Sequence, residues 1–224
     1  MSDARVVVVT GAAGALGSAV VEAFAAQGDR IAQLDVIEPN NGHWSTCCDL
    51  TDAAATSAAF DQLREHFGTI NVLANIAGGF AMGEAVHETG DDTWDFLFGL
   101  NARSILNTAR AAVPTLLAGG GGTIINVGAR GALRGAGQMG AYGAAKGVVH
   151  RLTEAQSDEL RSQGINVNAV LPSLIDTPRN RADMPDADFS QWVRPESIAG
   201  VICFLASPAA RDIHGALIPI DGLS

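Results

Sequence analysis

Short apolar runs of strand length alternate with longer segments of helical period along the whole chain. The runs are rich in Val and Ile, and the longer segments are rich in Ala and carry apolar residues at the spacing of one helix face. Strands are expected at 6–9, 30–34, 43–47, 71–74, 123–127, 166–171 and 217–220, and helices at 16–27, 52–67, 92–117, 139–163 and 195–205.

Apolar strands separated by helices predict a parallel sheet that is covered on both faces. We therefore expect an α/β protein with a single domain over residues 1–224. The expected architecture is a Rossmann-like, doubly wound parallel sheet of about seven strands with helices on both faces. The sequence contains neither a linker nor an internal repeat.

Two segments break the alternation. Only seven residues separate Asp35 from His43, whereas a parallel crossover normally needs about a dozen residues and usually a helix, so that helix is expected to be missing. Segment 176–192 is rich in Pro, Asp and Arg, and we expect it to be a lid over the substrate. The four glycines at 119–122 lie between a helix and a strand and predict a tight surface turn.

The composition indicates an acidic globular protein. Hydrophobic residues make up 47% of the chain, and the formal net charge of -10 argues against nucleic acid or an anionic membrane as a partner. No segment is long enough to span a membrane and no apolar leader precedes the first strand, so we expect a cytoplasmic protein with a small-molecule substrate. The three cysteines and five scattered histidines lack disulfide or metal-site spacing, so no metal is expected.

A glycine-rich turn follows the first expected strand. Gly11 would permit the tight turn, Gly14 would let the backbone approach a pyrophosphate, and Gly17 would let the next helix pack closely. The position between a strand and a helix favours a dinucleotide site, and a purely structural turn is the alternative.

Asp35 lies at the end of the second expected strand, about twenty residues after the turn. A carboxylate there can accept hydrogen bonds from ribose hydroxyls and would repel a 2′-phosphate. Neither the turn nor the residue after Asp35 supplies an arginine. We therefore expect NAD(H) as the cofactor, the alternative being that Asp35 only caps the strand.

Tyr142 and Lys146 are the only tyrosine and the only lysine in the chain, and they stand four positions apart. On a helix this spacing places both side chains on one face. A phenol has an ordinary pKa near 10 and a nearby cation lowers it, so Lys146 is expected to tune Tyr142 as a catalytic proton donor. A coincidence on a helix surface is the alternative.

These motifs together resemble the short-chain dehydrogenase/reductase family over essentially the whole chain. Thr10–Gly17 resembles the cofactor turn of that family, 49–50 its adenine-contacting strand end, 75–78 its fourth-strand motif, and the Tyr142 and Lys146 pair its catalytic motif. The resemblance implies that Asn101 holds a water of the proton relay, with a polar residue on a helix face as the alternative. It also implies that Lys146 binds the nicotinamide ribose and that Thr177 contacts the carboxamide.

The candidate residues form two sets. The catalytic set is Tyr142, Lys146 and Asn101. The cofactor-binding set is Gly11, Ala13, Gly14, Ala15, Leu16, Gly17, Asp35, Asp49, Leu50, Asn75, Ala77, Gly78, Tyr142, Lys146, Pro172 and Thr177.

One position departs from the family pattern. Most members carry a serine thirteen positions before the tyrosine, where its hydroxyl polarises the substrate carbonyl, and this chain has Ala129. Within the family, the dihydropteridine reductases are the branch of closest resemblance, through the segment around Tyr142, the short link after Asp35 and the lid. This resemblance implies that NADH reduces a quinonoid dihydropterin.

Three functions therefore stay open at this point. They are an NADH-dependent pterin reductase, a carbonyl or alcohol oxidoreductase with an unusual donor set, and a non-catalytic NAD-binding regulator. The resemblance also implies a homodimer or homotetramer, formed through the long Ala-rich helices at 92–117 and 139–163.

Overall fold

Seven parallel strands form one sheet in the order β3-β2-β1-β4-β5-β6-β7. The computed structural model describes residues 4–223, so residues 1–3 and 224 of the expected domain lie outside the described residues. The strands are β1 (Val6–Thr10), β2 (Arg30–Asp35), β3 (Trp44–Cys47), β4 (Val72–Asn75), β5 (Gly122–Val127), β6 (Ile165–Pro172) and β7 (Leu217–Ile220). The helices are α1 (Ala15–Ala25), α2 (Ala53–Phe67), α3 (Asp91–Phe98), α4 (Ser104–Ala118), α5 (Gly140–Leu160), α6 (Pro178–Asp183) and α7 (Pro195–Leu205). The expected fold class is confirmed.

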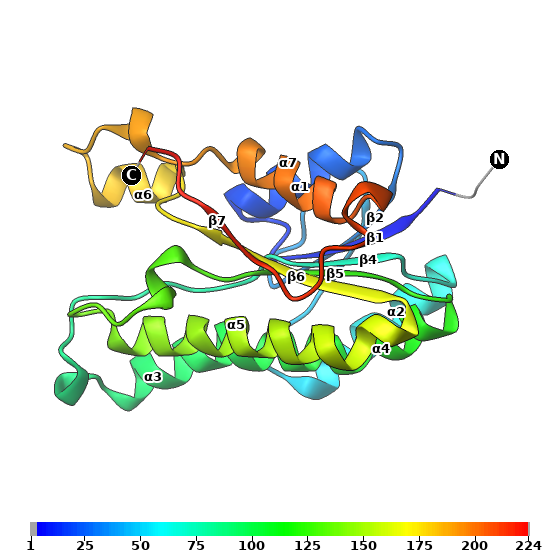
Figure 1. Cartoon of the computed structure of the whole chain (residues 1–224), viewed down its shortest axis with the longest axis horizontal. Helices are drawn as coiled ribbons and strands as arrows, with labels where there is room; N and C mark the ends of the chain where they lie inside the picture. The colour runs from blue at the N-terminus through cyan, green and yellow to red at the C-terminus, as the bar shows by residue number, and fades with distance from the viewer. Residues whose placement is uncertain (1–3, 224) are drawn as a thin grey trace.

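Helices cover both faces of the sheet (Figure 1). Helices α1 and α7 lie on one face, and α2, α4 and α5 lie on the other. Each face has its own apolar core. The first includes Phe24 of α1 and Ile202 of α7, and the second includes Phe60 of α2 and Leu116 of α4. Burial of strand side chains between these two layers is the main stabilising contribution to the sheet.

Local sequence signals set the ends of several elements. Asp52 caps α2 by accepting hydrogen bonds from the N–H groups of Ala54 and Ala55, and Gly68 ends this helix in the left-handed region at φ 77°. The turn at 119–122 is as tight as expected, because a Cβ on Gly121 would lie 2.3 Å from the carbonyl oxygen of Gly164. Helix α7 and strand β7 have the bounds that the periodicity predicts.

The link from β2 to β3 contains no helix. Residues 36–43 are all described and pass directly between the two parallel strands, as their number predicts. The single helix expected at 92–117 is instead two helices, because a π turn over Gly99–Arg103 separates α3 from α4. A π turn inserts extra backbone into a helix and is frequent at functional sites.

The strand order identifies the end of the sheet at which a ligand can bind. The chain proceeds outward from β1 to β2 and β3 on one side, and from β4 to β7 on the other. In doubly wound sheets, ligands bind at the carboxyl ends of the strands where the order reverses. Here the reversal lies between β1 and β4, and the glycine-rich turn follows β1 directly.

Candidate active site

The glycine-rich turn between β1 and α1 has contacts that exclude larger residues. Gly11 has φ 64°, and a Cβ there would lie 2.8 Å from the backbone of Ala77. A Cβ on Gly17 would lie 2.0 Å from the carbonyl oxygen of Gly11. The two glycines therefore let α1 begin close to β1 and let the turn touch the segment after β4.

The start of α1 fits the phosphates of a dinucleotide. Gly14 is the N-cap residue, and neither a side-chain cap nor an acidic residue occupies the first turn. The N–H groups and the positive end of the helix dipole are thus left without a competing carboxylate. Ala13, Ala15 and Leu16 are exposed or at the limit of burial in this turn, so the backbone here is accessible to an anion.

Asp35 joins the end of β2 to this turn. Its Oδ2 accepts the N–H of Ala13 at 2.9 Å, and its Oδ1 accepts the N–H of Ile37 at 3.1 Å. The carboxylate therefore lies against the turn, where it can also accept hydrogen bonds from a ribose diol.

A continuous set of contacts connects the turn with the catalytic candidates. Thr10 Oγ1 accepts the N–H groups of Ile76 and Ala77 at 3.0 and 3.1 Å, which binds the end of β1 to the end of β4. A Cβ on the next residue, Gly78, would lie 2.9 Å from Asn101 Oδ1 and 3.0 Å from Lys146 Nζ. The side chains of Asn101 and Lys146 therefore both lie against the backbone of Gly78.

The π turn sets the position of Asn101. This side chain is buried, its Oδ1 accepts the N–H of Gly79 at 3.1 Å, and its Nδ2 donates to the carbonyl oxygens of Gly79 and Leu97 at 3.0 Å each. Both polar atoms thus have protein partners. The structure shows Asn101 fixing the segment after β4, and its implied role with a water stays a prediction.

Tyr142 and Lys146 lie on the first turns of α5, and burial governs the charge of both. Lys146 Nζ donates to the carbonyl oxygen of Val127, at the end of β5, at 2.8 Å. Burial lowers the pKa of Lys146 from 10.5 to about 8 and raises the pKa of Tyr142 from 10.0 to about 12. The expected lowering of the Tyr142 pKa by Lys146 is therefore wrong for this structure, because burial of the phenol disfavours its charged form.

A small cavity of about 60 Å³ lies beside Tyr142. The ring of Phe80 meets Tyr142 edge to face, with centroids 4.8 Å apart. Gln138 lines the same cavity, and among the described residues it is the one non-glycine with positive φ, at 60°. Its carbonyl oxygen accepts the N–H of Gly83 at 2.9 Å, so the strained residue joins the segment after β4 to the start of α5.

The other predicted cofactor residues lie on neighbouring strand ends. Asp49 accepts the N–H of Thr51 just after β3, and the carbonyl oxygen of the buried Leu50 accepts Asn107 Nδ2 at 2.9 Å. Asn75 donates to Asn126 inside the sheet at 2.9 Å. Asp49 and Leu50 are two strands from the glycine turn, and Asn75 has a partner within the core.

Pro172 and Thr177 flank the start of the expected lid. Pro172 ends β6, and Thr177 is the N-cap of α6, accepting the N–H of Asn180 at 3.2 Å. The base of the segment is closed by a parallel bridge between Ile175 and Val193. Segment 176–192 is therefore an ordered loop that returns to its starting point.

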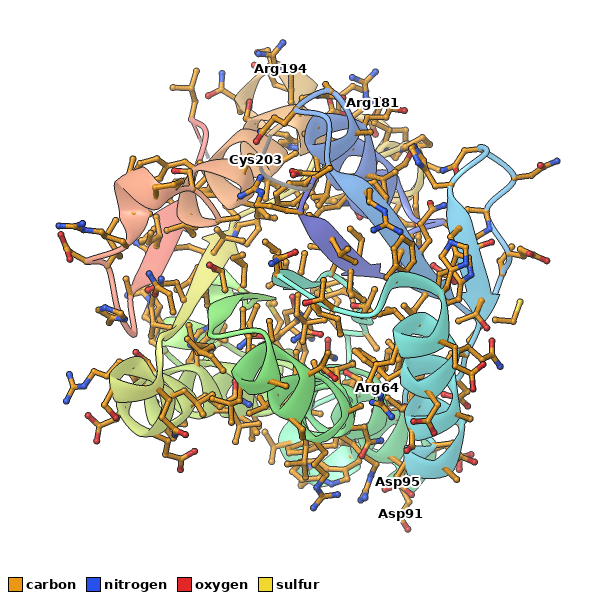
Figure 2. The ribbon with its side chains drawn as sticks, turned by 90° about the vertical axis from the view of Figure 1, so that its right-hand side faces the viewer. Arg64, Asp91, Asp95, Arg181, Arg194 and Cys203 are labelled. Atoms are coloured by element: carbon orange, nitrogen blue, oxygen red, sulfur yellow. The ribbon has the colours of Figure 1, made fainter. Side chains whose placement is uncertain are left out.

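An aromatic and charged cluster holds the inside of this loop. Arg181 forms a salt bridge with Asp176 at 2.5 Å, and its guanidinium lies 4.7 Å from the ring centroid of Phe189. Phe189 packs on Trp192, which is buried. Figure 2 shows Arg181 and Arg194 on the side of the molecule opposite Asp91 and Asp95 of α3. Burial assigns Trp192 to packing within the loop.

Three features of the site are not among the sequence candidates. Phe80 contacts Tyr142, Thr10 joins β1 to β4, and His150 accepts the N–H of Ala129 at 3.3 Å. The spacing of His150, one helical turn after Lys146, is a signal that places it on the catalytic face of α5. Phe80 has no comparable spacing signal, and Thr10 is marked in the sequence only as the first residue of the Thr10–Gly17 turn.

The described chain contains a second, larger hollow away from Tyr142. A hollow of about 950 Å³ lies at the amino ends of the strands, lined among others by Arg5 and Asp29, which pair with each other at 2.7 Å. It is at the opposite end of the sheet from Tyr142, so it is separate from the predicted catalytic residues.

Within residues 4–223, no helix is both long and apolar enough to cross a membrane. In the same residues, His, Cys, Asp and Glu side chains nowhere gather in groups of three suited to a metal ion.

Comparison with known proteins identifies relatives over nearly the full length. A family model described as "Enoyl-(Acyl carrier protein) reductase" matches residues 11–222. The 2-(R)-hydroxypropyl-CoM dehydrogenase of Xanthobacter autotrophicus is 32% identical over 97% of each chain. The D-threitol dehydrogenase of Mycolicibacterium smegmatis is 31% identical over 98% of this chain and 92% of that protein.

A solved structure agrees with these matches. The ligand-free aldohexose dehydrogenase of Thermoplasma acidophilum has a TM-score of 0.90 and 25% identity, covering 98% of this chain and 94% of that chain. These relatives are dehydrogenases of alcohols and sugars by name, and the expected closest match to dihydropteridine reductase receives no support from them.

Proposed function

The chain belongs to the short-chain dehydrogenase/reductase family of nicotinamide-dependent oxidoreductases, and on that premise we propose that it interconverts a ketone and the corresponding secondary alcohol. The observation that carries this proposal is that Lys146 and Asn101 both lie against Gly78, which directly follows Ala77, the residue that contacts the glycine-rich turn. The turn suited to hold a dinucleotide is thereby connected to two of the predicted catalytic residues, and Tyr142 lies one helical turn before Lys146 on α5.

Tyr142 would transfer the proton at the substrate oxygen. A bound nicotinamide would supply the hydride to the carbonyl carbon, so that one hydride and one proton convert the carbonyl group to an alcohol. A phenol with its ordinary pKa near 10 keeps its proton at neutral pH, and burial of Tyr142 raises that pKa further, to about 12. A protonated donor suits reduction of a carbonyl better than removal of a proton from an alcohol.

Lys146 and Asn101 would hold the surroundings of this reaction in place. Lys146 binds the end of β5 through the carbonyl oxygen of Val127, and Asn101 binds the segment after β4 through both atoms of Gly79 that can form hydrogen bonds. Rigid support of this kind keeps reacting groups in a productive geometry.

The proposed cofactor is NAD(H). Its phosphates would lie at the start of α1, and Asp35 would accept hydrogen bonds from the adenosine ribose. The support for NAD(H) over NADP(H) is the negative charge of Asp35 against the turn, where it bonds Ala13. That charge would repel a 2′-phosphate.

A second candidate is reduction of a quinonoid dihydropterin. The observation in its favour is Ala129, which follows the end of β5 and has no hydroxyl with which to polarise a carbonyl. Charge that develops on a ketone oxygen would lack this donor, whereas electron density added to a conjugated imine spreads over its rings. The names of the relatives favour the alcohol and ketone reaction.

A turnover screen tests these proposals. The purified protein is assayed with secondary alcohols and NAD⁺ or NADP⁺, and with ketones or quinonoid dihydropterin and NADH or NADPH. Tyr142→Phe serves as the control for background chemistry. We expect ketone reduction with NADH that disappears in the variant. A preference for the pterin by roughly tenfold in kcat/KM, the ratio that reports relative transition-state binding, would favour the second candidate.

We also propose that the protein acts in the cytoplasm as a homodimer or homotetramer. Trp94 and Phe96 of α3 are 45% and 49% exposed, and Leu106 of α4 is 37% exposed, on helices that family members pair across two-fold axes. Large exposed apolar side chains of this kind favour an interface. Light scattering at micromolar concentration should give at least twice the chain mass of 23.0 kDa, and a monomer would contradict this assembly.

A further inference from the structure

His150 lies on the same face of α5 as the proposed catalytic pair. It follows Lys146 by one helical turn and Tyr142 by two. Its side chain is 2% exposed. A buried imidazole is costly unless its polar atoms find partners, so its contacts indicate why it is there.

The imidazole contacts the backbone that follows β5. Its Nε2 accepts the N–H of Ala129 at 3.3 Å. A Cβ on Gly128 would lie only 2.6 Å from the same Nε2, so the chain passes directly beside the ring. The glycine at 128 is thus needed for this approach.

Helix α5 therefore holds the end of β5 at two successive points. Lys146 donates to the carbonyl oxygen of Val127 at 2.8 Å, and His150 accepts from the N–H of Ala129. Ala129 is 5% exposed, so without the imidazole its N–H would be a buried donor lacking a partner. The segment would then shift to regain a hydrogen bond.

The imidazole is held in its neutral form. Burial lowers the pKa of His150, and the charges of Arg151 and Lys146 lower it further. Neutral imidazole has one nitrogen that accepts a hydrogen bond, which the contact with Ala129 requires.

We propose that His150 is a positioning residue for the reaction, which acts by holding Ala129 and the end of β5 against α5 beside Lys146. This inference rests on the proposed oxidoreductase function for its kinetic consequence. Its structural part, the anchoring of the Ala129 N–H, is independent of any substrate.

Two substitutions separate the hydrogen bond from the volume of the ring. His150→Gln places an amide oxygen where it can accept the Ala129 N–H, and His150→Leu fills similar space without an acceptor. Gln156→Leu is the matched control, because Gln156 is a buried polar residue on the same helix whose Oε1 has no partner within the described chain.

The first readout is hydrogen exchange of the peptide that contains Ala129. We expect His150→Leu to accelerate exchange of this amide by roughly tenfold or more, as an opened hydrogen bond does. His150→Gln and Gln156→Leu should leave it near the wild-type rate. Unchanged exchange in His150→Leu would overturn the proposed anchor, even if no substrate is turned over.

The second readout is a split between kcat and cofactor affinity. We expect His150→Leu to lower kcat by roughly tenfold, with the Kd for NADH by fluorescence within about twofold of wild type and with recovery of kcat in His150→Gln. Should His150→Leu fail to fold, the shorter His150→Asn replaces it in both measurements. A wild-type kcat in a variant with accelerated exchange would show that the anchor does not serve catalysis.

Discussion

Replacing Lys146 by Met should change how the stability of the protein depends on pH. The pKa of Lys146 is about 8 in the folded protein instead of 10.5, because burial disfavours the charged ammonium. A lysine of this kind keeps its proton in the unfolded chain at pH values at which the folded protein has released it. The contribution of Lys146 to the free energy of unfolding therefore rises as the pH increases from about 8 to 10.5.

The two pKa values give the size of the effect. Between about pH 7 and about pH 9, titration of Lys146 should raise the free energy of unfolding by about 1.4 kcal/mol. Burial raises the pKa of Tyr142, Cys48 and Cys203, so their contributions have the opposite sign and are lost as the pH rises through their titration. Subtracting the free energy of unfolding of the variant from that of the wild type cancels the contributions of these groups and leaves the contribution of Lys146.

The assay is urea unfolding of wild type and Lys146→Met without nucleotide, at several pH values and one ionic strength. The difference in free energy of unfolding should grow in favour of the wild type as the pH rises. Arg151→Met is the control, because Arg151 is an exposed cation on α5, five positions after Lys146. Guanidinium groups are not deprotonated in proteins over this pH range. Its difference from the wild type should not depend on pH.

If the difference in free energy of unfolding between wild type and Lys146→Met does not change with pH, burial does not lower the pKa of Lys146. A change below about 0.3 kcal/mol over the same pH range would mean that Lys146 titrates near its ordinary pKa. The buried ammonium would then be solvated or paired in a way that the contact with Val127 does not provide.

Three other substitutions test the site. Tyr142→Phe should lower kcat by roughly a hundredfold or more while the Kd for NADH stays near wild type, and full activity would exclude the phenol as proton donor. Asp35→Asn should shift the ratio of kcat/KM values toward NADPH by roughly tenfold, because it removes the charge that repels a 2′-phosphate, and an unchanged ratio would contradict that role. Gln138→Gly should raise the free energy of unfolding by about 0.5 to 1 kcal/mol in urea, since relief of left-handed strain exceeds the entropy cost of glycine, and a loss of stability would show that the side chain makes compensating contacts.

The sequence predicts the sheet well because its strands are apolar and its turns carry distinctive glycines. Alternation and length also predict the direct link between β2 and β3, since seven residues cannot form a helical crossover. The alternation of apolar and polar residues does not predict the π turn at Asn101. One extra residue in a helix shifts the apolar pattern too little to be separated from ordinary irregularity.

The chemistry of the site is predicted less completely than the fold. Spacing places Tyr142 and Lys146 on one face of α5, but it does not show how deeply either is buried, and burial reverses the expected shift of the Tyr142 pKa. The role of His150 depends on Ala129, which is 21 positions earlier and on another element. Such a pair is visible only after β5 and α5 are placed side by side.

The π turn also lies between two helices with surfaces of different character. It places Gly99–Arg103 between α3, which carries exposed aromatic residues, and α4, which packs in the core. Because the turn absorbs an extra residue, the two helices need not share one rotational phase. Substitutions on α3 can therefore change its exposed aromatic surface while α4 keeps its register in the core. Asn101 lies in the turn itself and is held there by its contacts with Gly79.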